Sequence, residues 1–235
     1  MIGQPERSCF DQDFNEKTET SIVLKLKKWI EHKRSQRLQS QMELRESDVT
    51  DLKVFSESII AYKIITRRSD LLTEQENLTI EELIRKTWSN YQRKIWLLDP
   101  DKKEDLDNVY AAAGWLVRYY LLTGRFLGEP AERGKLAHII KDKIDSSTIE
   151  ELPRIARLWV LYRVLANEEP SENTEIRNNM EQVLIRDCYN SLTSMPTRDT
   201  EPITKDFSEP AIALGYLKLF QSKRPIRAGQ IVLNP

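Results

Sequence analysis

The chain of 235 residues carries 36 Lys and Arg against 37 Asp and Glu, a net charge of −1 that excludes recognition of nucleic acid by an overall basic field. It is long enough for a real core at a mean hydropathy of −0.55, yet its most apolar window, Val109 to Leu122, contains Arg118 and is too short to span a bilayer. Cys9 and Cys188 lie far apart and no secretory signal is evident, so we expect a soluble, cytoplasmic protein.

A long stretch without glycine dominates the first half of the chain. No glycine occurs between Gln4 and Ala113, and Pro5 and Pro100 are the only prolines there. Glycine supplies left-handed turns and proline interrupts helices and sheets, so such a stretch is most simply built from helices joined by polar turns. We therefore predict an all-α fold, an irregular multi-helix bundle or short helical array of about seven or eight helices. Its core should lie between residues 48 and 192.

The predicted elements begin with a polar, acidic arm over residues 1–20. A helical domain is expected over residues 21–195, and its first helix starts near Thr20 or Ser21 because Ile22, Leu26 and Ile30 fall on one face. The next helix should run from residue 48 to about 68, with Asp48 as its N-cap.

The clearest helix start lies at Thr79. Thr79 and Glu82 match the capping-box pattern, and Leu78 and Leu83 occupy the two positions of a hydrophobic staple. Apolar residues recur at helical spacing from there, and Asp99-Pro100 should end the helix. Trp96 lies nearly opposite part of this apolar stripe, so one of the two faces should be exposed or meet a second layer.

Four further helices are expected over residues of about 105–123, 130–145, 153–167 and 174–195. The first should be the most buried, end at a left-handed Gly124, and let a neighbouring helix come close at residues 111–114. A proline-rich linker (196–210), a C-terminal helix (211–222) and a tail (223–235) complete the chain.

One short sequence occurs twice. TIEEL stands at residues 79–83 and again at 148–152, and a tryptophan and a tyrosine follow each copy. The repeat indicates either a duplicated helix pair, at residues 79–122 and 148–192, or one good capping sequence used twice.

A basic segment from Lys25 to Arg37 is the most site-like feature of the sequence. The apolar face of the first helix turns basic after Ile30, so the helix should project into solvent or onto a partner. Such a segment suits a phosphate backbone, an anionic membrane surface or an acidic protein, and it equally suits a solvated helix end. The candidate contact residues are Lys25, Lys27, Lys28, Trp29, Lys33, Arg34 and Arg37.

Catalytic and metal-binding patterns give little support to an enzyme. His32 and His138 are the only histidines, neither at a recognisable ligand spacing, and we predict no catalytic residue, metal or cofactor. The segment GEPAERGK at residues 128–135 is superficially like a phosphate loop, but five residues separate its glycines and Leu136 replaces the Ser or Thr that holds magnesium. We interpret it as a turn between helices.

Taken together, these patterns favour a non-catalytic helical protein-interaction, scaffold or regulatory module in a cytoplasmic complex, with an unidentified protein partner. One alternative is a nucleic-acid-associated protein that contacts the phosphate backbone through residues 25–37. The other is an enzyme with no recognisable motif.

Overall fold

The computed structural model describes residues 24, 26–28, 31, 46–68, 71–99, 102–146, 152–170, 173–193 and 208–222. Within these ranges the chain is helical without strands, which confirms the predicted all-α fold. Residues 24, 26–28 and 31 are also helical. The numbered elements are α3 (Glu46–Thr66), α4 (Glu74–Gln92), the 3-10 helix η1 (Ile95–Leu97), α5 (Lys103–Thr123), α6 (Pro130–Asp145), α7 (Leu152–Ala166), α8 (Thr174–Thr193) and α9 (Ser208–Gln221).

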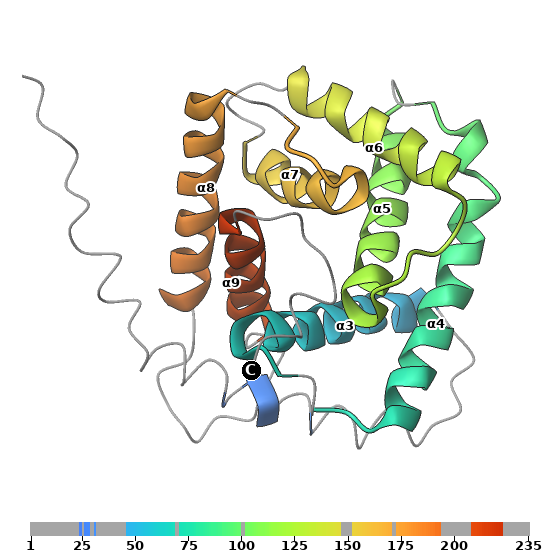
Figure 1. Ribbon diagram of the computed structural model, residues 1–235, viewed down its shortest axis with the longest axis vertical. Coiled ribbons are helices and arrows are strands. Elements are labelled where there is room, and N and C mark those ends of the chain that lie inside the picture. The colour runs from blue at the N-terminus through green and yellow to red at the C-terminus, as the bar shows by residue number, and fades with distance from the viewer. Residues whose placement is uncertain are drawn as a thin grey trace, which may run out of the picture.

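Most helices pack on their neighbours in sequence, and one contact joins two helices from opposite ends of the described chain (Figure 1). Helix α4 packs on α5, α6 on α7, α7 on α8 and α8 on α9. The closing contact joins α3 to α9, far apart in the sequence, so that α3 crosses below the upright α5 and α9. This contact makes the described helices one array around a shared core.

Helix α4 begins earlier than the sequence predicted. Its N-cap is Thr73, whose hydroxyl accepts from the Glu76 backbone N–H while the Glu76 carboxylate accepts from the Thr73 N–H at 2.8 Å. The capping box at Thr79 was therefore wrong, because Thr79 lies inside the helix and its hydroxyl donates to the Gln75 carbonyl. The predicted staple fails with it, since Leu78 is 51% exposed. Both threonines begin a T-x-x-E sequence, and the earlier one is the N-cap of the helix.

The end of α4 also differs from the prediction. The helix stops at Gln92, and a 3-10 turn over Ile95–Leu97 precedes the Asp99-Pro100 that we expected to end it. The turn buries Ile95 completely and leaves Trp96 57% exposed, whereas Trp88 on the helix is buried. The sequence correctly separated these two tryptophans onto different faces.

The remaining helices lie within a few residues of their predicted ranges, and α6 matches its range at both ends. Gly124 ends α5 with φ of 77°, the left-handed conformation that glycine adopts without a steric penalty. Asp48 does not cap α3, because the helix already starts at Glu46.

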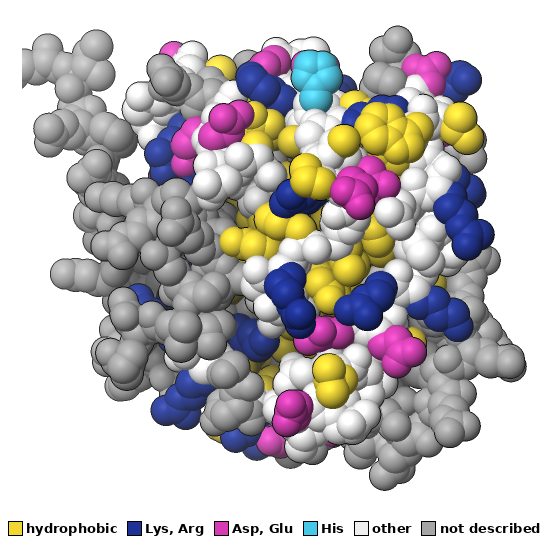
Figure 2. Space-filling model, turned by 45° about the vertical axis from the view of Figure 1, so that its right-hand side comes forward, with side chains coloured by type: hydrophobic (Ala, Val, Ile, Leu, Met, Phe, Trp, Pro, Cys, Tyr) yellow, Lys and Arg dark blue, Asp and Glu magenta, His cyan; other side chains and the backbone are white. Residues whose placement is uncertain are grey.

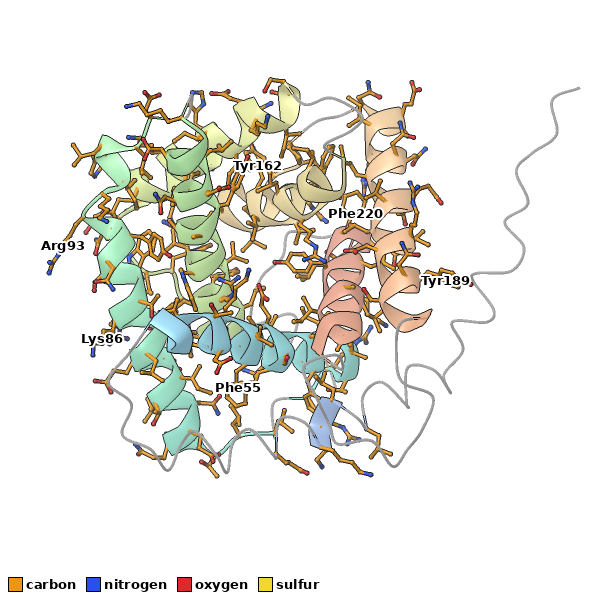
Figure 3. All side chains as sticks on the ribbon, turned by 180° about the vertical axis from the view of Figure 1, so that it is seen from behind. Phe55, Lys86, Arg93, Tyr162, Tyr189 and Phe220 are labelled. Carbon is orange, nitrogen blue, oxygen red and sulfur yellow. The ribbon has the colours of Figure 1, made fainter. Side chains whose placement is uncertain are left out.

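The core extends beyond the predicted range of 48–192. It includes Leu26 and several residues of α9, of which Phe220 lies between α7 and α9 (Figure 3). The close approach expected at residues 111–114 stays a prediction: Ala112 and Ala113 are fully buried, but a Cβ on Gly114 would meet first the Arg118 side chain of its own helix. A Cβ on Gly215 of α9 would lie 3.3 Å from Ala61 of α3. Helices α3 and α9 therefore approach closely at this point.

Only the first copy of TIEEL is described in full. Residues 79–83 lie inside α4, which begins at Glu74, whereas residues 148–151 of the second copy lie outside the described residues. The duplicated helix pair therefore stays one of two alternatives. The predicted arm (1–20) and tail (223–235, with Ser222 the last described residue) lie outside the described residues, as does the linker up to residue 207, and residues 208–210 belong to α9.

Candidate functional site

A surface groove of about 450 Å³ runs between α6 and the C-terminal end of α7. Gly134 and Ala137 are small residues on its α6 side, and a Cβ added at Gly134 would meet nothing within 4 Å. Leu165 and Ala166 of α7 contribute its apolar part. The complete lining is Pro130, Arg133, Gly134, Ala137, His138, Lys141, Tyr162, Leu165, Ala166 and Glu168.

Hydrogen bonds in the first turn of α6 hold this helix, which forms one side of the groove, against α4. The Glu129 backbone N–H donates to the Glu132 carboxylate at 2.8 Å, and the same carboxylate accepts from the Gln92 side chain at 3.1 Å. Gly128, with φ of 69°, is required here because a Cβ would lie only 2.3 Å from Glu132 Oε2. Leu136 and Ile140 on the inner face of α6 are fully buried. The groove is therefore held by a rigid helix.

The polar side chains of the groove differ in how fully they are paired. The Arg133 guanidinium stacks 4.3 Å from the Phe126 ring centroid, and its buried Nε has no hydrogen-bond partner. Lys141 donates to Asp145 at 2.8 Å and to the Pro170 carbonyl at 3.1 Å. A buried N–H without an acceptor is costly. Arg133 is thus the cation with unused hydrogen-bonding capacity.

The acidic side of the groove is already engaged. Glu168 accepts a short hydrogen bond from the Tyr162 hydroxyl, and burial together with this bond raises the pKa of Tyr162. His138 lies on the outer edge of the groove with its Nε2 3.3 Å from Asp142 Oδ2. Because Glu168 is partnered, the groove is a better receptor for acidic groups than for basic ones.

A second surface lies on the other side of α6, at η1. Trp96 and Leu97 are 57% and 82% exposed, the two most exposed large hydrophobic side chains of the described residues. Lys135 of α6 places its Nζ 5.2 Å from the Trp96 ring centroid. Figure 2 shows apolar side chains open to solvent on this side of the molecule, among basic and acidic ones.

An internal cleft among α3, α5, α7 and α9 has few polar groups and little room. Arg118 donates through Nε to Glu57 at 3.1 Å and through Nη2 to the same oxygen, and its guanidinium lies 4.7 Å from the Trp115 ring centroid. Burial, with the nearby Glu57 charge, raises the pKa of Tyr216 to about 12. The free space is about 30 Å³, roughly the volume of one water molecule. This cleft is a packed junction and holds no ligand of ordinary size.

No protein-family model, curated protein or solved structure matches the chain. The surfaces of the chain itself are therefore the basis for inferring its function.

The basic segment predicted as a contact site is described only in part. Lys27 and Lys28 are exposed and helical, Leu26 beside them is fully buried, and Lys27 Nζ lies 4.0 Å from Glu31. The outward lysines agree with a helix that buries its apolar face. Lys25, Trp29, Lys33, Arg34 and Arg37 lie outside the described residues. Nucleic-acid contact through this segment stays a prediction.

Sequence reasoning missed the groove because it considered Gly134 only as part of the GEPAERGK segment, although the helix predicted over residues 130–145 includes it. Gly134 lies inside α6, and Ala137, His138 and Lys141 follow it at positions that share one side of a helix. This spacing could have indicated from the sequence that these residues share a surface of the helix. Among the described residues, no group of three or more His, Cys, Asp or Glu side chains is arranged to hold a metal ion. Nor is any helix there long and apolar enough to cross a membrane.

Proposed function

We propose that this chain is a helical protein-interaction module that binds an acidic segment of a partner protein in the groove between α6 and α7. The observation that carries the proposal is the groove itself. At about 450 Å³ it falls within the size range of protein ligand sites, and it can hold a few side chains of an extended segment.

The charges of the groove favour an acidic occupant. Arg133 retains a buried N–H without an acceptor, and Lys141 and His138 line the same side. A carboxylate of the partner would accept from the Arg133 guanidinium, and hydrogen bonds between charged groups are the stronger ones. The only carboxylate in the lining, Glu168, already accepts from Tyr162.

The open space over Gly134 makes the proposal testable with a matched pair of variants. Gly134→Trp fills the groove, whereas Ala131→Trp adds the same side chain to an exposed position of α6 that does not line it. Partners captured from native lysate by the wild-type chain are identified, and their binding to each purified variant is then measured. We expect Gly134→Trp to lose about tenfold or more in affinity, the loss of one good interface contact.

Ala131→Trp should bind as the wild type does. The proposal fails if Gly134→Trp keeps every partner at unchanged affinity while circular dichroism shows that it is folded. It also fails if the captured partners bind through basic segments, because the groove would then repel them.

A further inference from the structure

The 3-10 turn η1 presents two apolar side chains to solvent at a corner of the molecule. Leu97 is 82% exposed and Trp96 is 57% exposed, while Ile95 between α4 and these residues is fully buried and anchors the turn. We call Trp96 and Leu97 the η1 tip. Exposed side chains of this size are uncommon in adjacent positions, because burying each would contribute roughly 1.5–3 kcal/mol elsewhere in a protein.

Basic residues flank the η1 tip in the sequence, and one from α6 contacts it. Residues 83–98 contain four basic residues (Arg85, Lys86, Arg93 and Lys94) and no Asp or Glu. Lys86 and Arg93 both point away from the bundle along the outer side of α4 (Figure 3), and Lys135 of α6 lies against the Trp96 ring.

These cations are largely uncommitted. Lys86, Arg93 and Lys94 are exposed and make no ion pair within the described part of the chain, whereas Arg85 donates to the Tyr119 hydroxyl at 2.8 Å. Two acids of this region are engaged: Asp99 pairs with Lys102 at 3.7 Å, and Glu132 accepts from Gln92 and from the Glu129 backbone N–H. Glu129 itself is exposed. The η1 tip is therefore flanked in sequence by the exposed cations Arg93 and Lys94, which outnumber the acids described beside it, although acidic side chains also lie on this side of the molecule (Figure 2).

We infer that the η1 tip inserts into the headgroup region of an anionic lipid membrane, with Arg93, Lys94 and Lys135 contacting the headgroups. Tryptophan is favoured at membrane interfaces because its ring is apolar and its N–H is polar. Two side chains at a turn can enter a soft lipid surface, whereas a stable protein partner needs about 800 Å² of contact on each side. Charge complementarity selects anionic lipid over neutral lipid.

The strength of this contact should be modest and dependent on salt. Each Lys or Arg close to an anionic membrane strengthens partitioning by roughly fivefold, and this contribution declines when salt shortens the range of the electrostatic field. Two inserted apolar side chains add to it without reaching the permanence of a spanning helix. The membrane contact is peripheral and reversible, and it lies apart from the groove between α6 and α7.

Co-sedimentation of the full chain with vesicles tests the inference. Vesicles of phosphatidylserine mixed with phosphatidylcholine are compared with vesicles of phosphatidylcholine alone, at low and at high salt. We expect binding to the anionic vesicles only, weakened at high salt. The double variant Trp96→Ala/Leu97→Ala should lose roughly tenfold or more of this binding. Its control is Leu78→Ala, which removes a similarly exposed side chain from α4 and should bind unchanged.

A second variant pair tests the charges without altering the apolar residues. Arg93→Glu/Lys94→Glu should reduce binding by roughly 25-fold or more, from the fivefold contribution of each cation. The control, Lys53→Glu/Arg186→Glu, makes the same charge change at exposed positions of α3 and α8. It should lower only the non-specific attraction of the whole chain to an anionic membrane. Gly134→Trp should bind vesicles like the wild type, which separates this surface from the groove.

Three outcomes would overturn the inference. The first is no binding to anionic vesicles at low salt. The second is equal binding by the wild type and by a folded Trp96→Ala/Leu97→Ala variant. The third is binding of the η1 tip to soluble polyglutamate with no binding to vesicles, which would identify the site as a receptor for acidic protein segments instead.

Discussion

The basic residues inside the helical array and those around η1 differ in what their donors contact. Arg163, on α7, donates to the carbonyls of Leu219 (2.9 Å), Phe220 (2.8 Å) and Ser222 (2.7 Å) at the end of α9, and its Nε lies 2.8 Å from Glu169. Arg93 and Lys94 are exposed to solvent and make no ion pair with the described residues. The interior cations are therefore structural, and the exposed ones are available to a ligand.

Lys63 shows the same structural use of a buried cation. It donates to the Leu122 carbonyl at 3.2 Å, near the end of α5, and burial lowers its pKa. The last carbonyls of a helix have no partner within the helix, so a buried cation there satisfies them. Two helix ends, those of α5 and α9, are thus closed by side chains from other helices. This pattern links α3 to α5 and α7 to α9.

The largest expected effect is on Arg163. Arg163→Met keeps most of the apolar length of the side chain but leaves three carbonyls without their donor and Glu169 without its partner. We expect the free energy of unfolding to fall by about 3–5 kcal/mol, the usual cost of breaking a buried charged network. Urea unfolding measures it, and Arg186→Met on the exposed side of α8 is the control. A loss no larger than that of the control would show that the network does not stabilise the fold.

The Glu57–Arg118 pair should show a smaller effect with a distinctive pattern. Arg118→Met leaves a nearly buried Glu57 unpaired and should cost about 2–3 kcal/mol, somewhat less than a fully buried pair because the Glu57 side chain is 13% exposed. The double variant Glu57→Met/Arg118→Met should recover much of that loss, because no unpaired charge remains. Additive losses in a double-mutant cycle by urea unfolding would contradict this interpretation.

Two glycines offer the smallest effects, and they are opposite in sign. Gly215→Ala places a Cβ 3.3 Å from Ala61 at the contact of α3 and α9, and should destabilise the protein by about 1–2 kcal/mol. Gly134→Ala has open space around its Cβ within α6 and should stabilise by about 0.5–1 kcal/mol, because alanine favours the helix. Thermal unfolding of both variants checks the two signs. The same sign for both would show that the glycines are not distinguished by their surroundings.

The fold was largely predictable from the sequence because helical periodicity is a local property. The apolar stripes of α3, α5 and α6 place these helices to within a few residues. The first residue of a helix was harder to predict where two T-x-x-E sequences lie close together, as at Thr73 and Thr79. The contact of α3 with α9 was not predictable, because it joins segments far apart in sequence and depends on the fit of Gly215 against Ala61.

The candidate sites were less predictable than the fold. The sequence drew attention to residues 25–37, of which the structure describes Leu26, Lys27, Lys28 and Glu31. It noted that Trp96 departs from the apolar stripe of α4, but not that Lys135 would lie beside it, since α6 follows η1 only after the whole of α5. The groove depends on the distance between two helices, which periodicity alone does not determine.

Whether the η1 tip serves a ligand and not the fold is tested most directly by one paired measurement on Trp96→Ala/Leu97→Ala. Its unfolding free energy and its binding to anionic vesicles are both compared with those of the wild type. We expect an unfolding free energy within about 0.5 kcal/mol of the wild type, as for exposed positions generally, and loss of vesicle binding. Unchanged vesicle binding together with a fall of several kcal/mol in stability would contradict it, because the η1 tip would then serve the fold and not a ligand.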